Sequence, residues 1–350
     1  MSHRFIQLHL LTFYGPANLN RDDTGRPKTA IVGGVERLRV SSQSLKRAVR
    51  TSEVFKETLS GHYASRTQRL GKEIEDHLKE RQIPDDQARS VARDIAGMFG
   101  KIKGEKENNP TYIEQLAFIS PEERAAAIAL AERKAADPDL EIKKDDLLQT
   151  TDGAADIAMF GRMLADDPKF NREAAVQVSH AFTTHKGIVE ADFYTANDDV
   201  KAADENADAG AGFLGNTGFG SGVFYTYANV NVPLLLENLG GNAEIAQKSI
   251  AALTQCLATV SPTGKQNSFA SRSRADYILA ERGNDAPRNL AGAFLEPVTG
   301  ENLMSASARA LEDYRKRMTK AYGETADDPA VLDVHNGAGS LSDIVTYVTA

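Results

Sequence analysis

The sequence predicts an α+β protein, a ferredoxin-like domain that carries two insertions. Stretches rich in β-branched and aromatic residues, which favour strands, alternate with amphipathic helical stretches near both ends of the chain. A long, charged, Ala-rich block of helical pattern and a shorter acidic, Gly-rich stretch lie between the two ends. Alternating strands and helices are typical of an α+β domain, and the two intervening stretches resemble insertions rather than core.

The N-terminal elements follow from hydrophobic pattern. Residues 4–14 form an apolar run that predicts a strand, and residues 36–40 alternate charged with apolar side chains as a half-buried strand does. Residues 15–34 are rich in turn-forming residues and are predicted to be a loop. Residues 41–55 are predicted to be a helix that begins at a serine, because serine is a good N-cap.

The rest of the chain divides in the same way. Residues 56–181 are predicted to be mostly helical, with a capping-box-like start after Ser120, and residues 180–195 return to strand or loop pattern. Residues 196–222 form the acidic, Gly-rich excursion. Four further elements are predicted from periodicity: a strand over 223–232, a helix over 242–260, a strand over 275–281 and a C-terminal helix over 301–323.

Bulk composition restricts the class of protein. The chain has 350 residues, of which 41% are hydrophobic and 26% are charged, as in ordinary globular proteins. Its one cysteine, Cys256, excludes an internal disulfide framework and a multi-cysteine zinc site, and suits the cytoplasm. Residues 1–15 lack a small-residue cleavage site, so a first strand is expected rather than a signal peptide. No stretch has the apolar length of a membrane helix.

The glycines Gly210, Gly212 and Gly215 match a dinucleotide-binding pattern only in their spacing. That fingerprint needs a buried strand before the glycines and a helix after them. Here an acidic stretch precedes them and a strand pattern follows, so a flexible loop that feeds a strand is the favoured interpretation.

Charge is distributed unevenly despite a net charge of −8. The basic residues of 35–50 are Arg37, Arg39, Lys46, Arg47 and Arg50, against Glu36 alone. On the predicted helix, Lys46 and Arg50 are four residues apart and share a face, and the helix N-terminus offers free N–H groups. A phosphate backbone suits this surface, and an ordinary solvated helix face is the alternative.

Three other segments carry candidate chemistry. Asp22 and Asp23 could hold Mg²⁺, although Asn and Asp in such a loop more often stabilise turns. The stretch SHAFTTH, residues 179–185, holds His, Ser and Thr without a nucleophile elbow, which favours a structural or hydrogen-bonding role. The loop that contains Lys265 and Gln266 follows a helix stop and is a second candidate phosphate contact.

These motifs together resemble a known family. In chain order they are LNRDD, IVGG, RLRVSSQSLKRAVR, GRM, SHAFTTH, DFYTANDD, SGVFYTYANVNV and LLLENLGG. The chain resembles in them the CasC backbone subunit of type I-E CRISPR Cascade, within the repeat-associated mysterious protein superfamily. The resemblance is strongest in residues 4–55 and 157–241, and weak in residues 56–150.

The resemblance implies a hand-shaped protein with a ferredoxin-like (RRM-like) palm, helical fingers and a β-hairpin thumb. The palm would comprise residues 1–58, 180–191 and 223–350, the fingers residues 59–179, and the thumb residues 192–222. Copies of a non-catalytic, cofactor-free subunit would stack along a CRISPR RNA in the cytoplasm. Each thumb would displace one base, and the guide would pair with target DNA between thumbs. Other Cascade subunits and a recruited nuclease-helicase would be partners, and no membrane would be involved.

The resemblance also implies roles for individual residues. Contacts with the RNA backbone would come from Arg21, Ser41, Gln43, Lys46, Arg50, Lys265 and Gln266. Contacts with the displaced nucleotide would come from Met163, Phe193, Tyr194 and Thr195. The chain has no tryptophan, so it departs from a Trp-Phe-Thr pattern of the family.

Two other functions are weighed against the scaffold role. A metal-dependent ribonuclease would use Asp22 and Asp23, as backbone subunits of type III complexes use an acidic palm residue. A free-standing RRM-like module is the weaker alternative, because the aromatic signature of that fold is missing.

Overall fold

The structure is a computed structural model that describes residues 3–164, 167–196, 213–323 and 327–350. The chain forms two compact units. The sheet unit comprises Met1–Ser52, Val178–Asn229 and Leu253–Ala350, and the helical unit comprises Glu53–Gln177 and Val230–Ala252. The helical unit therefore contains a stretch, Val230–Ala252, that the expected palm would have included. The positions Gly210 and Gly212 and the acidic residues of 197–212 lie outside the described residues.

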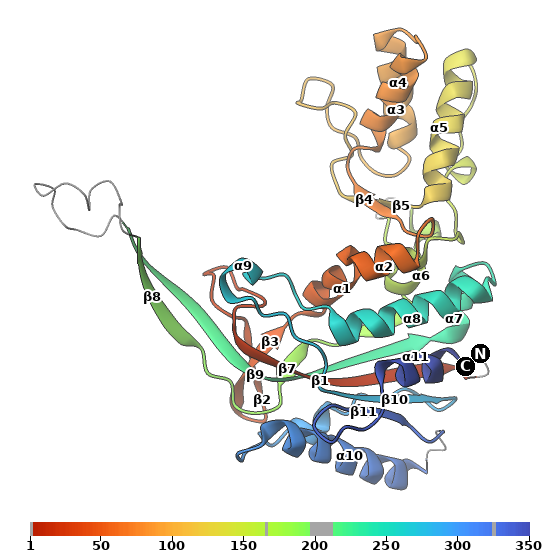
Figure 1. Cartoon of the computed structure of the whole chain (residues 1–350). Coiled ribbons are helices and arrows are strands. Elements are labelled where there is room, and N and C mark those ends of the chain that lie inside the picture. The colour runs from red at the N-terminus through yellow and green to blue at the C-terminus, as the bar shows by residue number, and fades with distance from the viewer. Residues whose placement is uncertain (1–2, 165–166, 197–212, 324–326) are drawn as a thin grey trace, which may run out of the picture. The chain divides into compact units, whose positions relative to one another are not determined.

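The sheet unit is built on one sheet with the strand order β11-β10-β1-β9-β7-β3-β2 (Figure 1). The strand bounds are β1 Phe5–Ala17, β2 Thr29–Val32, β3 Val35–Val40, β6 Val176–Val178, β7 Ala181–Thr183, β8 Glu190–Ala196, β9 Phe213–Asn231, β10 Tyr277–Gly283 and β11 Ala330–Asp333. Strand β1 pairs antiparallel with β10, from Phe5 opposite Gly283 to Leu11 opposite Tyr277. Strands β6 and β8 pair with β9 outside the main order.

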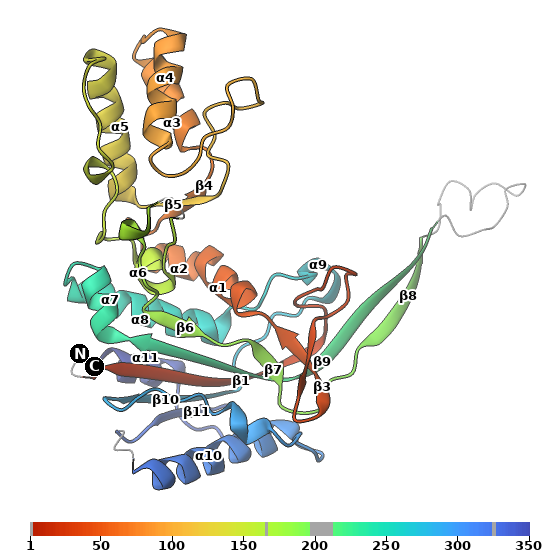
Figure 2. The same ribbon diagram turned by 180° about the vertical axis from the view of Figure 1, so that it is seen from behind.

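The helices of the chain join and cover these strands. Along the sequence, helix α1 lies between β1 and β7, and α8 lies between β9 and β10, so the four central strands follow a βαββαβ pattern. Helices α10 and α11 contact β1, β10 and β11 (Figures 1 and 2). The bounds are α1 Ser42–Thr51, α8 Ala243–Thr259, α9 Gln266–Phe269, η4 Ala291–Phe294, α10 Leu303–Tyr322 and α11 Leu341–Thr349.

Alternation along the strands gives the sheet two apolar faces. On β9, Tyr225 and Tyr227 belong to a cluster with Leu311 of α10, whereas Phe224 belongs to a cluster with Leu45 of α1. Successive strand residues point to opposite faces, so one strand supplies side chains to both clusters. Helix α1 is thereby fixed against the sheet by its apolar side, and its polar side is left for other contacts.

The helical unit packs three helices around its own core. Helices α3, α4 and α5 contact one another, and strands β4 and β5 form a separate antiparallel pair (Figures 1 and 2). The bounds are α2 Glu53–Thr58, β4 Ser65–Thr67, α3 Leu70–Glu80, α4 Asp85–Ala96, β5 Ala117–Ile119, α5 Pro121–Ala136, η1 Lys144–Asp146, α6 Ala155–Phe160, η2 Pro168–Phe170 and α7 Val232–Asn238. Ser120 forms the predicted capping box with Glu123 at the start of α5.

Several local predictions were wrong. The predicted loop 15–34 contains strand β2, which forms a hairpin with β3 through Gly33 and Gly34. Both glycines have positive φ angles, 61° and 77°, which is the geometry of a tight hairpin turn. The predicted helix 41–55 breaks at Ser52, whose backbone is extended, and α11 follows the helix predicted to be the last.

The glycine-rich loop was also predicted wrongly from Phe213 onward. Strand β9 begins at Phe213 and pairs antiparallel with β8, so Gly215 is a strand residue. A Cβ on Gly215 would lie 2.3 Å from the ring of Tyr194. This glycine therefore makes room for an aromatic side chain on the neighbouring strand.

Candidate nucleic-acid interface

Three of the sequence-predicted segments meet in one open hollow of the sheet unit. The hollow is lined by the loop after β1, by Ser44 of α1, and by the loop before α9; its residues are Leu19, Asn20, Arg21, Asp22, Asp23, Gly25, Ser44, Thr263 and Gly264. The three segments are far apart in sequence, and the fold brings them together. Each of them contains residues predicted to contact an RNA backbone.

Gly264 allows the closest approach among these segments. A Cβ at this position would lie 2.2 Å from the carbonyl oxygen of Leu19 and 2.8 Å from that of Asn18. Only a residue without a side chain fits there. Lys265 follows directly and has a left-handed backbone, with a φ of 48°.

Two asparagines hold the first loop in place. The Asn18 side chain is fully buried, and its Nδ2 donates to the carbonyl oxygens of Gly25 (3.0 Å) and Gly218 (2.9 Å). The Oδ1 of Asn20 accepts a hydrogen bond from the backbone N–H of Ser41 at 2.9 Å. The loop that carries Arg21 is therefore tied both to strand β9 and to the start of α1.

Helix α1 has the predicted capped start and polar face. The Oγ of Ser41 accepts from the N–H of Ser44, and Leu45, Ala48 and Val49 are buried against the sheet. On the other side, Gln43 is exposed, whereas Lys46 and Arg50 are half-buried. Because the Ser41 hydroxyl already caps the helix and is almost fully buried, it is less open to an RNA contact than the other predicted residues.

Arg37 does not belong to the basic face on which the sequence placed it. Its side chain is fully buried, and its guanidinium donates to the carbonyl oxygens of Thr183 and Phe294, each at 3.0 Å. Arg37 and Arg39 lie two residues apart on the same face of β3, but Arg37 is covered by its carbonyl partners whereas Arg39 stays partly exposed. Arg37 is therefore a structural residue of the sheet unit.

A basic cluster that the sequence did not reveal surrounds His180. The Nη1 of Arg39 lies 2.9 Å from the Nδ1 of His180, and since arginine only donates, this nitrogen accepts and the imidazole is neutral. Burial lowers the pKa of His180, and the positive charges of Arg39, Lys28 and Lys46 lower that pKa further. Three cations, those of Arg39, Lys28 and Lys46, thus act on one exposed imidazole.

The two neighbouring aspartates, Asp22 and Asp23, have different surroundings. The Oδ1 of Asp22 accepts from the N–H and hydroxyl of Thr24 and from the N–H of Arg26. The hydroxyl of Thr24 makes the largest contribution to the lowered pKa of Asp22. Asp22 thus closes a turn, the alternative that the sequence left open, and Asp23 is exposed. Among the described residues, no three His, Cys, Asp or Glu side chains come together as a metal site.

Gln266 uses its amide within its own loop. Its Nε2 donates to the carbonyl oxygens of Pro262 (2.7 Å) and Ser271 (3.1 Å). This closes the loop that presents Lys265, which is half-buried. Of the two predicted contacts, Lys265 has the freer side chain.

The three predicted residues of β8 do not share one face. Phe193 lies opposite Asn216 in the β8–β9 pair, Tyr194 opposite Gly215, and Thr195 follows. Phe193 is 65% exposed and points to the same side as Thr195, whereas Tyr194 points to the other side and packs on Gly215. Phe193 is therefore the side chain best placed to stack on a base.

Met163 belongs to the helical unit and is 81% exposed, far above the exposure usual for a large apolar side chain. It follows Gly161, which has a positive φ of 80°, and Arg162, which is buried. In the GRM motif, Gly161 thus forms a turn, Arg162 is a buried anchor, and Met163 presents an exposed apolar side chain.

Comparison with known proteins identifies the family. The model of the CT1975-like protein family matches residues 6–344. The chain belongs to this family. It is similar, at 31% identity and a TM-score of 0.87 over 99% of both chains, to a solved structure described as a "CRISPR RNA-guided surveillance complex, pre-nicking". It is also similar to a "CRISPR RNA-guided surveillance complex", at 25% identity and a TM-score of 0.62 over 99% of this chain and 98% of that one.

The search among curated proteins found no match. Among the helices that the structure describes, none has the length and apolar character needed to cross a membrane.

Proposed function

We propose that this chain is the non-catalytic CRISPR RNA-binding backbone subunit of a type I-E Cascade surveillance complex. Copies of it polymerise along the guide RNA and displace bases at intervals, so that the guide pairs with target DNA in antiviral defence. Other Cascade subunits and a recruited nuclease-helicase are its partners in the cytoplasm. Family membership and the likeness to two CRISPR surveillance structures support this proposal.

The observation that carries the proposal is the meeting of three predicted RNA-contact segments in one hollow, which Ser44 near the start of α1 helps to line. Arg21 lines the hollow together with Asp22 and Asp23, and the lysines Lys46 and Lys265 follow closely after its lining residues Ser44 and Gly264 in the chain. Such a surface binds phosphates irrespective of sequence, and base pairing then reads the sequence.

Three features support the proposed hand, although Val230–Ala252 groups with the helical unit and not with the expected palm. The strand order β10-β1-β9-β7, with helices after the first and third strands in chain order, supports a ferredoxin-like palm at residues 1–58, 180–191 and 223–350. The α3–α5 core supports fingers at 59–179, and the β8–β9 pair supports a thumb at 192–222. In this assignment Phe193 and Met163 contact the displaced nucleotide.

The test is to co-express the chain with a CRISPR RNA and to purify the protein with whatever nucleic acid it retains. We expect RNA that is protected from nuclease, except for bases displaced at a regular interval. The double variant Lys46→Ala plus Arg50→Ala loses two phosphate contacts, which reduces the slope of log affinity against log salt by about 1.4 on single-stranded RNA.

The matched control is Lys316→Ala plus Lys320→Ala, two exposed lysines that are also four residues apart, on α10 of the same unit. The control removes the same net charge and keeps the RNA. Equal RNA loss in both double variants contradicts a specific role for α1, and a wild-type protein that purifies without RNA contradicts the proposed function.

A further inference from the structure

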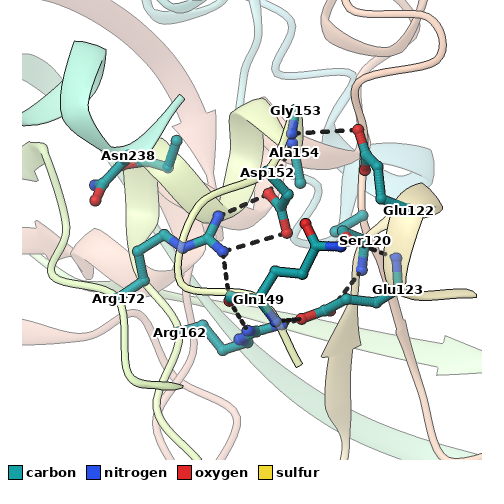
Figure 3. A network of polar contacts seen from close by, with 12 residues as sticks. Ser120, Glu122, Glu123, Gln149, Asp152, Gly153, Ala154, Arg162, Arg172 and Asn238 are labelled. Carbon is teal, nitrogen blue, oxygen red and sulfur yellow. Dashed lines mark hydrogen bonds and ion pairs between the residues drawn. The ribbon is translucent and has the colours of Figure 1, made fainter. Parts of the chain in front are cut away.

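Two arginines of the helical unit, which precede and follow Met163 in the chain, are each buried in an ion pair. Figure 3 shows the two pairs. Arg162 pairs with Glu123 at 2.6 Å, and Arg172 pairs with both oxygens of Asp152, at 2.7 and 3.2 Å. All four side chains are at most 1% exposed. Removing four charged groups from water is costly, and the pairing and the further hydrogen bonds of each group offset this cost.

The two guanidiniums converge on one backbone carbonyl. The oxygen of Gln149 accepts from Arg162 at 3.1 Å and from Arg172 at 2.9 Å. The N–H of the same residue donates to Glu123 at 3.1 Å. Gln149 is therefore held from both ends of its backbone, and the two ion pairs form one connected cluster (Figure 3).

The same arginines close a loop with their backbones. The N–H of Arg162 donates to the carbonyl of Arg172 at 3.0 Å, and the reverse bond is 2.8 Å long. The N–H of Leu164 donates to the Oδ1 of Asn171 at 2.6 Å. Met163 lies between these bonded positions, so its backbone is fixed on both sides while its side chain is exposed.

Asn238, in the LLLENLGG motif, extends this support. Its Nδ2 donates to the carbonyl oxygens of Ala158 (3.0 Å) and Glu173 (2.9 Å), which fixes the chain before and after the loop. Gly161 cannot be replaced freely, because a Cβ there would lie 2.9 Å from the carbonyl oxygen of Arg172. Two motifs that lie about 70 residues apart in the sequence thus serve one loop.

We propose that the pairs Arg162–Glu123 and Arg172–Asp152 are positioning pairs that hold the backbone of Met163 so that its side chain meets the face of a displaced nucleobase. The inference rests on the proposed function. Methionine has a flexible side chain, and a wedge made from it needs a rigid backbone to act at a fixed place. The guanidinium forks fix direction as well as distance, which a lysine cannot do.

The test uses Arg172→Lys in the full chain assembled on a guide RNA that carries 2-aminopurine at a displaced position. Lysine keeps the charge and loses the two-point contact with Asp152. We expect the fluorescence rise of the unstacked base to be lost to the same extent as in Met163→Ala. RNA affinity should stay within about threefold, because the backbone contacts are in the sheet unit. The double variant Met163→Ala plus Arg172→Lys should show no further loss.

The matched control is Arg124→Lys, which alters another arginine ion pair of the same unit. Arg124 pairs with Glu73 and donates to Ser65, and it makes no bond to Gln149 or to the residues of the loop that the structure describes. It should lower thermal stability and keep the fluorescence rise. Asp152→Asn serves as a second probe where Arg172→Lys folds poorly. A full fluorescence rise in folded Arg172→Lys or Asp152→Asn overturns the inference, as does equal loss in Arg124→Lys. A wild-type protein that binds no RNA contradicts the proposed function instead.

Discussion

Replacing Gly264 by alanine should separate the two loops that meet at the hollow lined by Arg21 and Gly264, which we propose to contact RNA. The new Cβ would lie 2.2 Å from the carbonyl oxygen of Leu19. Carbon–oxygen contacts are normally about 3.3 Å or longer, so the loops must move apart by about 1 Å. Overpacking of this size costs about 1–3 kcal/mol, and the lower end is expected because the hollow is open to solvent.

The functional loss should exceed what this destabilisation explains. Lys265 follows the altered residue, and moving it away from the loop that carries Arg21 removes one charge-assisted phosphate contact. Such a contact contributes about 1.5 kcal/mol, which is about tenfold in Kd. The salt dependence of binding should fall by about 0.7 in slope. Fluorescence anisotropy with a labelled guide RNA at several salt concentrations measures both quantities.

The matched control is Gly15→Ala, at a glycine of the same unit whose added Cβ would meet nothing within 4 Å. It should leave RNA affinity and salt slope unchanged. Unchanged affinity in Gly264→Ala, with a normal salt slope, would refute the reasoning that the close approach of the two loops builds the phosphate-binding surface.

Three other predictions concern single residues of the sheet unit. A phosphate near His180 opposes the cations that lower its pKa, so binding should take up a proton and affinity should rise as pH falls below the ordinary histidine value of about 6.5, by at most about tenfold per pH unit. Anisotropy against pH should show this slope, and His180→Gln should remove it. Phe193→Ala should lose about 1–3 kcal/mol of base stacking, and with it the 2-aminopurine signal. Tyr194→Ala should lower the melting temperature of the protein and keep that signal. The reverse result would contradict the faces assigned to these two side chains. Asp22→Asn keeps the acceptor of its turn, so RNA binding should not change, and Mg²⁺-dependent RNA cleavage by the wild type that this change abolishes would establish the ribonuclease alternative.

Hydrophobic pattern predicted three of the longer elements, the first from an apolar run and the other two from helical periodicity. The strand over 4–14, the helix over 242–260 and the helix over 301–323 all occur, with ends that differ by a few residues. The hairpin at Gly33 and Gly34 was missed although its signal, two glycines between alternating runs, stood in the sequence. The reason why polar residues occur in the first strand is visible only in the folded structure.

His9 shows why. It interrupts an apolar run, yet it is fully buried, with its Nδ1 3.0 Å from the hydroxyl of Tyr225 and its Nε2 3.4 Å from Glu281. These partners are more than 200 residues away along the chain. No local pattern can pair such residues, because only the sheet order brings β1, β9 and β10 together.

The sequence likewise predicted some residues of the candidate site and missed others. The basic face of α1 followed from helical spacing, and its apolar side is buried as expected. Arg37 was misplaced because a charged residue on a strand is exposed far more often than it is buried. The roles of Arg162 and Arg172 were not predicted, since their partners Glu123 and Asp152 lie on other segments.

The amide of Asn18 has one more consequence. Strand β9 has glycines at 218, 220 and 222, so one of its faces lacks side chains that would fix how the strand aligns with its neighbour. The bond from Asn18 to the carbonyl of Gly218 supplies that alignment. A slip of two residues would change the reach of Phe193 by about 7 Å at 3.4 Å per residue. The buried amide of Asn18 therefore helps to set how far Phe193 extends from the sheet.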